Sequence, residues 1–158
     1  MKDKSYRCAE CGKDMAWRGY RNVEQVGRFT VADATAMAWQ CEACGEANVT
    51  LDALAGYERR AAAVVLRDAA DVDGAVVKYA RKALGMKQAD LADRIGCHAE
   101  TLSRYETDAA PVPPGVRLAI VAILDGVERA GSLEAYRCQR TKGADDTFEV
   151  PPPRRECA

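Results

Sequence analysis

Residues 88–106, QADLADRIGCHAETLSRYE, decide the fold of the C-terminal half, because their apolar and small residues follow the pattern of a helix-turn-helix. Leu91 and Ile95 are four residues apart, which places both side chains on one face of a first helix. Ala92 is small enough for a second helix to cross closely above it, and Gly96 permits a sharp turn at the end of the first helix. The stretch therefore predicts two short helices joined by a tight turn.

The second of these helices has an apolar inner face and a polar outer face. Cys97, Leu102 and Tyr105 form the inner face, which makes Cys97 a core residue rather than a metal ligand. A recognition helix presents such a polar set to the major groove of DNA, while the first residue of the preceding helix typically contacts phosphate. The predicted DNA-binding residues are Gln88, His98, Ala99, Glu100, Thr101, Ser103 and Arg104. An ordinary amphipathic helical hairpin is the alternative interpretation.

The same stretch resembles the Xre (Cro-like) helix-turn-helix family, whose typical ending Ser-Arg-Tyr-Glu is present here as residues 103–106. Two positions depart from the family pattern. His98 stands where a helix-capping Ser or Thr is usual, and Asp108 stands near a usual glycine. Both departures are tolerable in the chemistry of caps and turns. The resemblance implies that the domain binds double-stranded DNA.

The charge of the chain argues against a nonspecific nucleic-acid binder. The 158 residues are 48% hydrophobic and 30% charged, with a formal net charge of −1, and residues 76–134 contain eight Lys or Arg and eight Asp or Glu. DNA contact must therefore depend on local cations and should be specific and sensitive to salt. The cations that precede the motif are Lys78, Arg81, Lys82 and Lys87.

Four of the seven cysteines form two Cys-x-x-Cys pairs, each followed by glycine, as in knuckle turns whose backbone amides point at thiolate sulfur. Two knuckles supply four thiolates, so the sequence predicts one structural zinc ion per chain rather than disulfides. The predicted ligands are Cys8, Cys11, Cys41 and Cys44. A thioredoxin-like redox pair is the alternative, but two pairs without a βαβ pattern argue against it. Cys138 and Cys157 are expected to be free thiols.

The predicted fold class is α+β, in four segments. Residues 1–50 form a small zinc-ribbon-like β domain, residues 51–73 a helical connector, residues 74–134 an all-α helix-turn-helix domain that binds DNA and dimerises, and residues 135–158 a flexible tail. Asp73 is the expected N-cap of the helix that follows it. Within the first segment, six apolar residues recur at the even spacing of strands with one covered face. They are Met15, Trp17, Phe29, Val31, Met37 and Trp39.

A further helix is predicted at residues 115–130, directly after three closely spaced prolines. Its seven apolar residues cannot all lie on one face, so the helix must be covered on more than one side. One side is expected to close over the helix-turn-helix core and the other to meet a second subunit, which predicts a homodimer that reads palindromic DNA. Burial within a single domain is the alternative.

The order of these segments over residues 6–130 resembles the MqsA antitoxin family with its YgiT-type zinc finger. The resemblance implies that the zinc domain binds and neutralises a ribonuclease toxin, while the C-terminal domain dimerises and represses its own operon. By position, the four paired cysteines match the zinc ligands and Arg104 matches the base-reading arginine. Glu100 stands where an asparagine is the expected base reader, so the operator sequence does not carry over.

Two other classes of function stay open. A regulator without a toxin, such as a transcriptional adaptor like the archaeal multiprotein bridging factors, would use the zinc domain for another partner or only as architecture. An enzyme is disfavoured, because the sole histidine lies in the DNA motif and no cysteine or serine has an evident base partner. The sequence lacks both a run of ~20 apolar residues for a membrane span and a signal-peptide core, so a cytoplasmic protein is expected.

Overall fold

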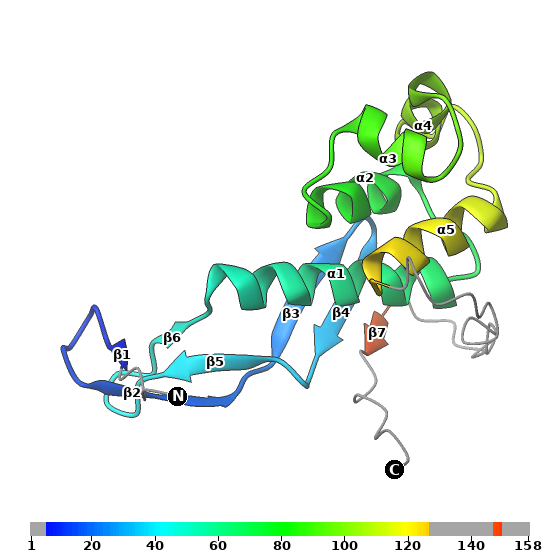
Figure 1. The fold of residues 1–158 in the computed structure, drawn as a ribbon. Coiled ribbons are helices and arrows are strands. Elements are labelled where there is room, and N and C mark those ends of the chain that lie inside the picture. Colours follow the sequence, from blue (N-terminus) through cyan, green and yellow to red (C-terminus); the bar gives the residue numbers. More distant parts are fainter. Residues whose placement is uncertain (1–5, 127–146, 150–158) are drawn as a thin grey trace, which may run out of the picture.

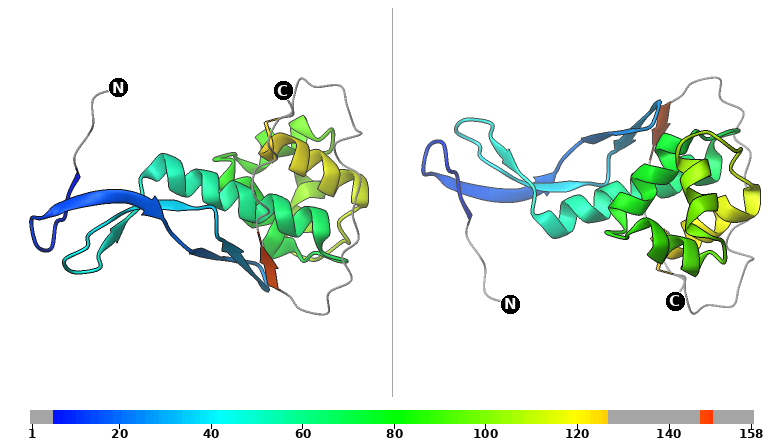
Figure 2. Two further views of the ribbon diagram at one scale, coloured as in Figure 1. Left: turned by 90° about the horizontal axis from the view of Figure 1, so that it is seen from below. Right: turned by 90° about the horizontal axis from the view of Figure 1, so that it is seen from above.

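The structure, a computed structural model, describes residues 6–126 and 147–149. Its elements confirm the predicted α+β class, with six strands preceding the helices in the chain (Figure 1). A long helix, α1 (Leu51–Asp68), runs from the first sheet into the helical part of the molecule. Figure 2 shows that the described part is elongated, with the first sheet projecting at the end opposite to the helices.

The first sheet carries the two Cys-x-x-Cys pairs in its turns. Its strands are antiparallel in the order β1-β2-β5-β6. They are β1 (Tyr6–Arg7), β2 (Asp14–Gly19), β5 (Met37–Gln40) and β6 (Ala47–Asn48). Met15 and Trp39 pack with Cys8 and Cys41 in a small core of their own. Trp17 lies opposite Trp39 in the register but is 40% exposed, so it is not a core residue.

The second sheet belongs to the main core of the molecule. Its order is β3-β4-β7, with β3 (Asn22–Val26) antiparallel to β4 (Phe29–Asp33) and β7 formed by Thr147–Glu149. Val26, Phe29 and Val31 are buried in one cluster with residues of the helices. The alternating apolar residues of the first segment therefore do not all face the same core. Because the β3–β4 hairpin leaves the first sheet and packs on α1, these residues are divided between two cores.

Helix α1 begins at Leu51, as predicted, and Thr50 caps it by accepting a hydrogen bond from the backbone amide of Ala53. Six consecutive residues, 61–66, are buried. A helix can bury successive residues only when neighbours cover it on several sides, and here β3, β4, α2 (Gly74–Ala83) and α5 (Pro114–Leu124) all pack against it. Helix α1 is thus the centre of the main core, whereas the sequence pattern had predicted only a connector.

Two polar contacts fix α1 to the strands. The Tyr57 hydroxyl accepts a hydrogen bond from the Met37 amide at 2.7 Å and donates to the Met37 carbonyl. Arg60 donates to Asp33 Oδ2 at 3.0 and 2.6 Å. Burial raises the pKa of the Asp33 carboxyl, but hydrogen bonds from Thr35 and Arg60 outweigh it, so the net effect is a lowered pKa. The carboxylate therefore stays charged and holds the end of β4 on the helix.

Four short helices complete the described C-terminal part. They are α2 (Gly74–Ala83), α3 (Gln88–Arg94), α4 (Ala99–Glu106) and α5 (Pro114–Leu124). Asp73 is the N-cap of α2, as predicted, and accepts a hydrogen bond from the Val76 amide at 3.0 Å.

Helix α5 packs against α1 as well as the helix-turn-helix core. Ile120, Val121 and Leu124 are buried, and Leu118 is the exposed large apolar residue of the helix. Arg117 donates hydrogen bonds to carbonyl oxygens at the C-terminal end of α1, at distances from 2.6 to 3.3 Å. The same chain thus covers much of the apolar surface that the sequence assigned to a second subunit. The homodimer stays a prediction.

Part of the predicted flexible tail forms a strand. Residues Thr147–Glu149 make β7, which pairs in parallel with β4, Thr147 lying beside Thr30. The segment combines a β-branched and an aromatic residue, which favour strands, and β4 has a free edge that can accept it. The remaining residues of the predicted tail, including Cys138 and Cys157, lie outside the described residues.

Substitution of Gly74 by alanine is expected to destabilise the fold, because α2 begins directly against the end of α4. A Cβ atom at Gly74 would lie 2.4 Å from the Tyr105 carbonyl oxygen and 2.5 Å from the Glu106 carbonyl carbon. Such backbone overlap costs on the order of 1 to 3 kcal/mol. Urea denaturation measures the resulting change in the free energy of unfolding. Gly115→Ala is the control, since no atom lies within 4 Å of its Cβ position, and we expect about 0.4 to 1 kcal/mol of added stability there.

Candidate functional site

Helices α3 and α4 have the geometry that the sequence predicts. Gly96 adopts a left-handed conformation, with φ of +72°, and the Cys97 amide donates to the Ala92 carbonyl at 2.9 Å across the turn. Leu91, Ala92 and Leu102 are buried where the two helices meet. The helix pair is therefore rigidly packed, and its outer face is presented by a fixed backbone.

The two departures from the Xre pattern have different outcomes. His98 occupies the N-cap position of α4 without a side-chain capping hydrogen bond. Asp108 has φ of +57°, a conformation that glycine, asparagine and aspartate tolerate better than most residues, and its carboxylate accepts a hydrogen bond from the Gly74 amide at 2.6 Å. Asp108 thus replaces the usual glycine and also ties the loop after α4 to the start of α2.

Six of the seven predicted DNA-binding residues lie in α4 or at its N-cap. His98, Ala99, Glu100 and Arg104 are exposed, and Thr101 and Ser103 are half-buried. No ion pair joins Glu100 to Arg104 within the described residues. The acid and the base, one helical turn apart, are therefore both presented outward.

Gln88 and Arg81 are positioned differently from the rest of the predicted surface. Arg81 donates to both carboxylate oxygens of Glu106 at 2.6 and 3.1 Å and to the Met86 carbonyl at 3.0 Å, while Gln88 Nε2 donates to Glu106 Oε2 at 3.0 Å. The side chain of Glu106 is 4% exposed and that of Arg81 is 15% exposed. The hydrogen bonds that Arg81 donates to Glu106 raise the pKa of Arg81, so its guanidinium stays charged.

This network corrects the interpretation of Arg81, which the sequence placed among the cations available to DNA. Its guanidinium is engaged inside the domain, where it joins the end of α2, the start of α3 and the end of α4. The pairing was missed because Arg81 and Glu106 are 25 residues apart and have no local spacing signal. For Gln88, the phosphate contact stays a prediction, and its amide already bonds to Glu106.

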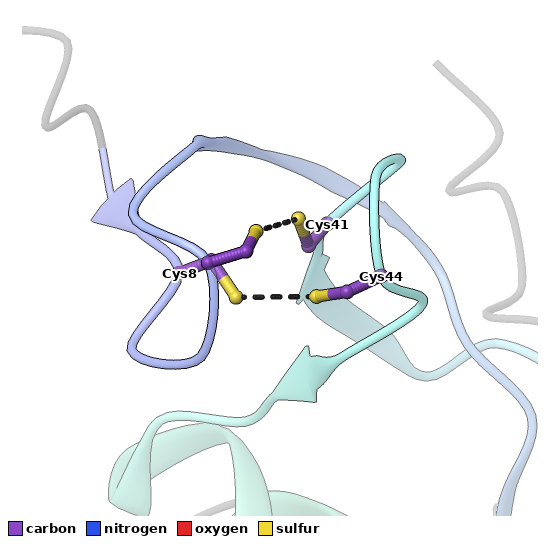
Figure 3. A group of neighbouring side chains, drawn as sticks. Cys8, Cys41 and Cys44 are labelled. Carbon is purple, nitrogen blue, oxygen red and sulfur yellow. Dashed lines mark hydrogen bonds between the residues drawn. The ribbon is translucent and has the colours of Figure 1, made fainter.

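The four paired cysteines converge from the two turns of the first sheet, as Figure 3 shows. All four Sγ atoms lie within 4.8 Å of one another, and the separation is 3.5 Å for Cys8 and Cys44 and 3.4 Å for Cys11 and Cys41. Tetrahedral thiolates at ~2.3 Å from a zinc ion would be ~3.8 Å apart. The sulfur spacing therefore fits a four-thiolate metal site with no open position.

The two knuckles have the same backbone hydrogen bonds. In the first turn, the Cys8 amide donates to Lys13 O at 2.8 Å and the Gly12 amide donates to Cys8 O at 2.9 Å. In the second, the Cys41 and Gly45 amides make the matching bonds, both at 2.9 Å. Gly12 and Gly45 have φ of +70° and +77°, the left-handed conformation that the turn requires.

The knuckle amides also favour the thiolate form of a ligand. Backbone amides of Cys44 and Ala43 lower the pKa of Cys41 to about 6, whereas at Cys44, against the effect of the Glu46 amide, the hydrogen bond between the Cys8 and Cys44 sulfurs raises the pKa to about 12. Cys97 behaves differently: it packs against the main core, and burial raises the pKa of its thiol. The structure thus separates four convergent cysteines from a core cysteine, as the sequence predicts.

The rigid helix pair and its exposed polar face define the class of the protein as a helix-turn-helix DNA-binding transcriptional regulator. Residues 77–128 match the helix-turn-helix family, so the chain carries a domain of the Xre type over that range. No curated protein matches the chain. None of the described helices combines the length and the apolar character that a membrane crossing needs.

Proposed function

We propose that the protein is a sequence-specific transcriptional repressor that reads operator DNA with α4 and holds one structural zinc ion at its four-cysteine site. The observation that carries the proposal is the exposed polar face of α4 on a rigid Xre-type helix pair. The formal net charge of −1 supports specific rather than charge-driven binding.

The zinc part of the proposal rests on the donor set. Four soft thiolates at tetrahedral spacing suit zinc, and the absence of a histidine among the convergent groups is compatible with a purely structural site of four thiolates. Cys8, Cys11, Cys41 and Cys44 would hold the ion, which would supply cross-linking energy to the small first sheet. The ion would be structural rather than catalytic, because four protein ligands leave it no position for a substrate or water.

We also propose that the repressor acts as a dimer. Operator palindromes match a two-fold axis, with half-sites about one helical turn (34 to 36 Å) apart. Leu118 of α5, an exposed large apolar residue, is available for such an interface. Sedimentation of the zinc-loaded protein with and without operator DNA measures the stoichiometry.

The resemblance to the MqsA antitoxins extends the proposal to a toxin partner. The four-cysteine sheet lies at the end of α1 remote from α4 (Figure 1), so a protein bound there leaves α4 free for DNA. Co-expression with the small ribonuclease of a neighbouring open reading frame tests this role: relief of toxicity and a stable complex are expected. A neighbouring gene of another kind would favour the regulator without a toxin.

Replacement of Arg104 by alanine is expected to cost about 1 to 3 kcal/mol in binding to the specific duplex, because an exposed arginine on α4 can contact guanine O6 and N7 together. Binding to a scrambled duplex should change much less. Both affinities are measured at one salt concentration by fluorescence anisotropy.

Arg59→Ala is the matched control, since it removes the same charge from an exposed position on α1. We expect this variant to bind the specific duplex as the unsubstituted protein does. Equal losses on specific and scrambled DNA for Arg104→Ala would reduce Arg104 to a phosphate contact. Gln88→Ala is expected to weaken binding to all sequences alike.

A further inference from the structure

Each turn of the four-cysteine site presents one exposed and one buried cysteine. Cys11 in the first turn and Cys44 in the second are exposed, whereas Cys8 and Cys41 are buried, each with 2% exposure. An oxidant in solution can therefore reach one cysteine of each turn directly. Cysteines that respond to oxidants combine such access with a second cysteine that is close enough to form a disulfide.

A cysteine that could form this disulfide lies in the opposite turn. Cys11 Sγ is 3.4 Å from Cys41 Sγ, and Cys44 Sγ is 3.5 Å from Cys8 Sγ. Figure 3 shows Cys8 and Cys44 facing each other across the space between the two turns. A disulfide bond is ~2.05 Å long, so each contact has to shorten by roughly 1.4 Å. Each exposed cysteine thus has a buried partner within reach in the other turn.

We propose that the four cysteines are also a site of reversible oxidation, at which a peroxide forms the disulfides Cys8–Cys44 and Cys11–Cys41 and zinc is released. The proposal rests on the zinc site of the proposed function, but it does not depend on DNA binding, on a dimer or on a toxin. It assigns the bonds between the two turns rather than within either Cys-x-x-Cys pair.

Each pair of cysteines consumes one molecule of hydrogen peroxide. The exposed thiolate attacks one peroxide oxygen, the O–O bond breaks, and the cysteine becomes a sulfenic acid while hydroxide leaves. The buried partner then attacks the sulfenic sulfur, which forms the S–S bond and expels a second hydroxide. Two protons from solvent convert the hydroxides to water. The two cysteines lose two electrons and the peroxide gains them, and the disulfide sulfurs no longer serve as thiolate ligands.

The positions of the cysteines in the chain favour bonds between the turns. Cys8 and Cys44 are 36 residues apart, and Cys11 and Cys41 are 30 residues apart. The two cysteines of one turn are separated by only two residues. A disulfide that closes a longer loop removes more freedom from the unfolded chain, so it stabilises the folded chain more. In a buffer that allows disulfides to exchange, the bonds between the turns should therefore predominate.

The oxidised chain is expected to keep its first sheet folded. Bonds between the turns connect the β1–β2 turn to the β5–β6 turn, which are the two segments that supply the four cysteines. Bonds within each turn would leave the two turns unconnected around a small core. Loss of zinc by oxidation should therefore have a different structural effect from loss of zinc to a chelator under reducing conditions.

The test uses the full-length, zinc-loaded chain with Cys97→Ala, Cys138→Ser and Cys157→Ser, so that the four paired cysteines are the remaining thiols. Hydrogen peroxide is added stepwise, and the released zinc is measured with a colorimetric chelator. About two equivalents of peroxide should release one zinc ion per chain, because four thiolates lose four electrons. Reduction with dithiothreitol and addition of zinc should restore one ion per chain.

Tryptophan fluorescence measures whether the first sheet stays folded, because both tryptophans lie on it. After oxidation, the emission maximum should stay at the wavelength of the zinc-loaded chain. A matched sample treated with a chelator and dithiothreitol loses the ion without gaining disulfides, so its emission should shift to longer wavelength. Equal shifts in the two samples would contradict bonds between the turns.

Peptide mapping without reduction identifies the bonds. Glu10 lies between the two cysteines of the first turn and Glu42 between those of the second, so a glutamyl endopeptidase cleaves between them. We expect one linked peptide for each proposed pair and none for a pair within one turn. Dimedone, which traps sulfenic acids, should label Cys11 and Cys44 when it is present during oxidation.

Four results would overturn the proposal: zinc retained in a large excess of peroxide, disulfides within the turns, sulfinic acids without disulfides, or dimedone on the buried cysteines. A chain without zinc before oxidation would instead refute the zinc site of the proposed function. In that case the peptide map of the oxidised, metal-free chain still decides whether the sulfurs pair between the turns.

Discussion

Serine at both Cys41 and Cys44 is expected to abolish zinc binding and to unfold the first sheet while leaving the helices folded. The small core of this sheet consists of Cys8, Met15, Cys41 and the partly buried Trp39, so little apolar burial remains without the metal. Coordination by four thiolates contributes on the order of 10 kcal/mol in small zinc domains. The main core, which contains none of the four ligands, retains its own packing.

Metal analysis measures the loss of zinc. Tryptophan fluorescence measures the unfolding of the first sheet, because both tryptophans lie on it. Zinc should fall from one per chain to none, and tryptophan emission should shift to longer wavelength. Cys97→Ser, at the core cysteine, serves as the matched control and should keep one zinc. Full zinc content in the double variant would refute the ligand assignment.

The second large effect is expected at Glu106, whose substitution by alanine leaves the Arg81 guanidinium charged inside the domain. Removal of one partner from a buried ion pair costs about 3 to 5 kcal/mol. The bond from Gln88 is lost at the same time, so the junction of α2, α3 and α4 loses its polar contacts. We expect a lower free energy of unfolding in urea and weaker binding to all DNA.

Asp71→Ala provides the control for this measurement. Asp71 accepts from Arg28 at 2.7 Å, but their side chains are 77% and 44% exposed, so loss of this pair should cost no more than about 1 kcal/mol. Substitution of both Arg81 and Glu106 by apolar residues should recover much of the stability that Glu106→Ala loses. Equal, small effects of Glu106→Ala and Asp71→Ala would show that the buried pair is not a stabilising contact.

Local sequence patterns were sufficient to predict the helix-turn-helix and the convergence of the four cysteines. The helix-turn-helix is defined by the spacing of Leu91, Ala92 and Leu102 and by the left-handed Gly96, all within one short stretch. The cysteine cluster follows from two identical knuckles, whose glycines adopt the same backbone conformation. Such features depend on neighbours in the chain, so a single sequence contains them.

Contacts between distant segments were not predictable in the same way. The apolar alternation of β3 and β4 shows that one face is covered, but not that α1 rather than the first sheet covers it. The pairing of Arg81 with Glu106 and the parallel pairing of β7 with β4 join residues far apart in the sequence. Which of these distant residues pair depends on tertiary packing, and the spacing of residues within one stretch of sequence does not determine it.

The packing of α1 suggests how the two sites are related. Tyr57 ties the helix to β5, which leads to Cys41, and Arg60 ties it to β4, while the buried residues 61–66 pack in the same core as the helix-turn-helix. The four-cysteine sheet is therefore attached to the DNA-binding part by a packed helix rather than by a free linker.

Sequence reading by α4 is tested most directly by the selection of DNA from a pool of random duplexes with the zinc-loaded, full-length protein. We expect enrichment of one inverted repeat with half-sites about one helical turn apart, and loss of that enrichment in Arg104→Ala but not in Arg59→Ala. Retention of duplexes without any common sequence, or the same enriched sequence from Arg104→Ala, would contradict sequence reading by α4.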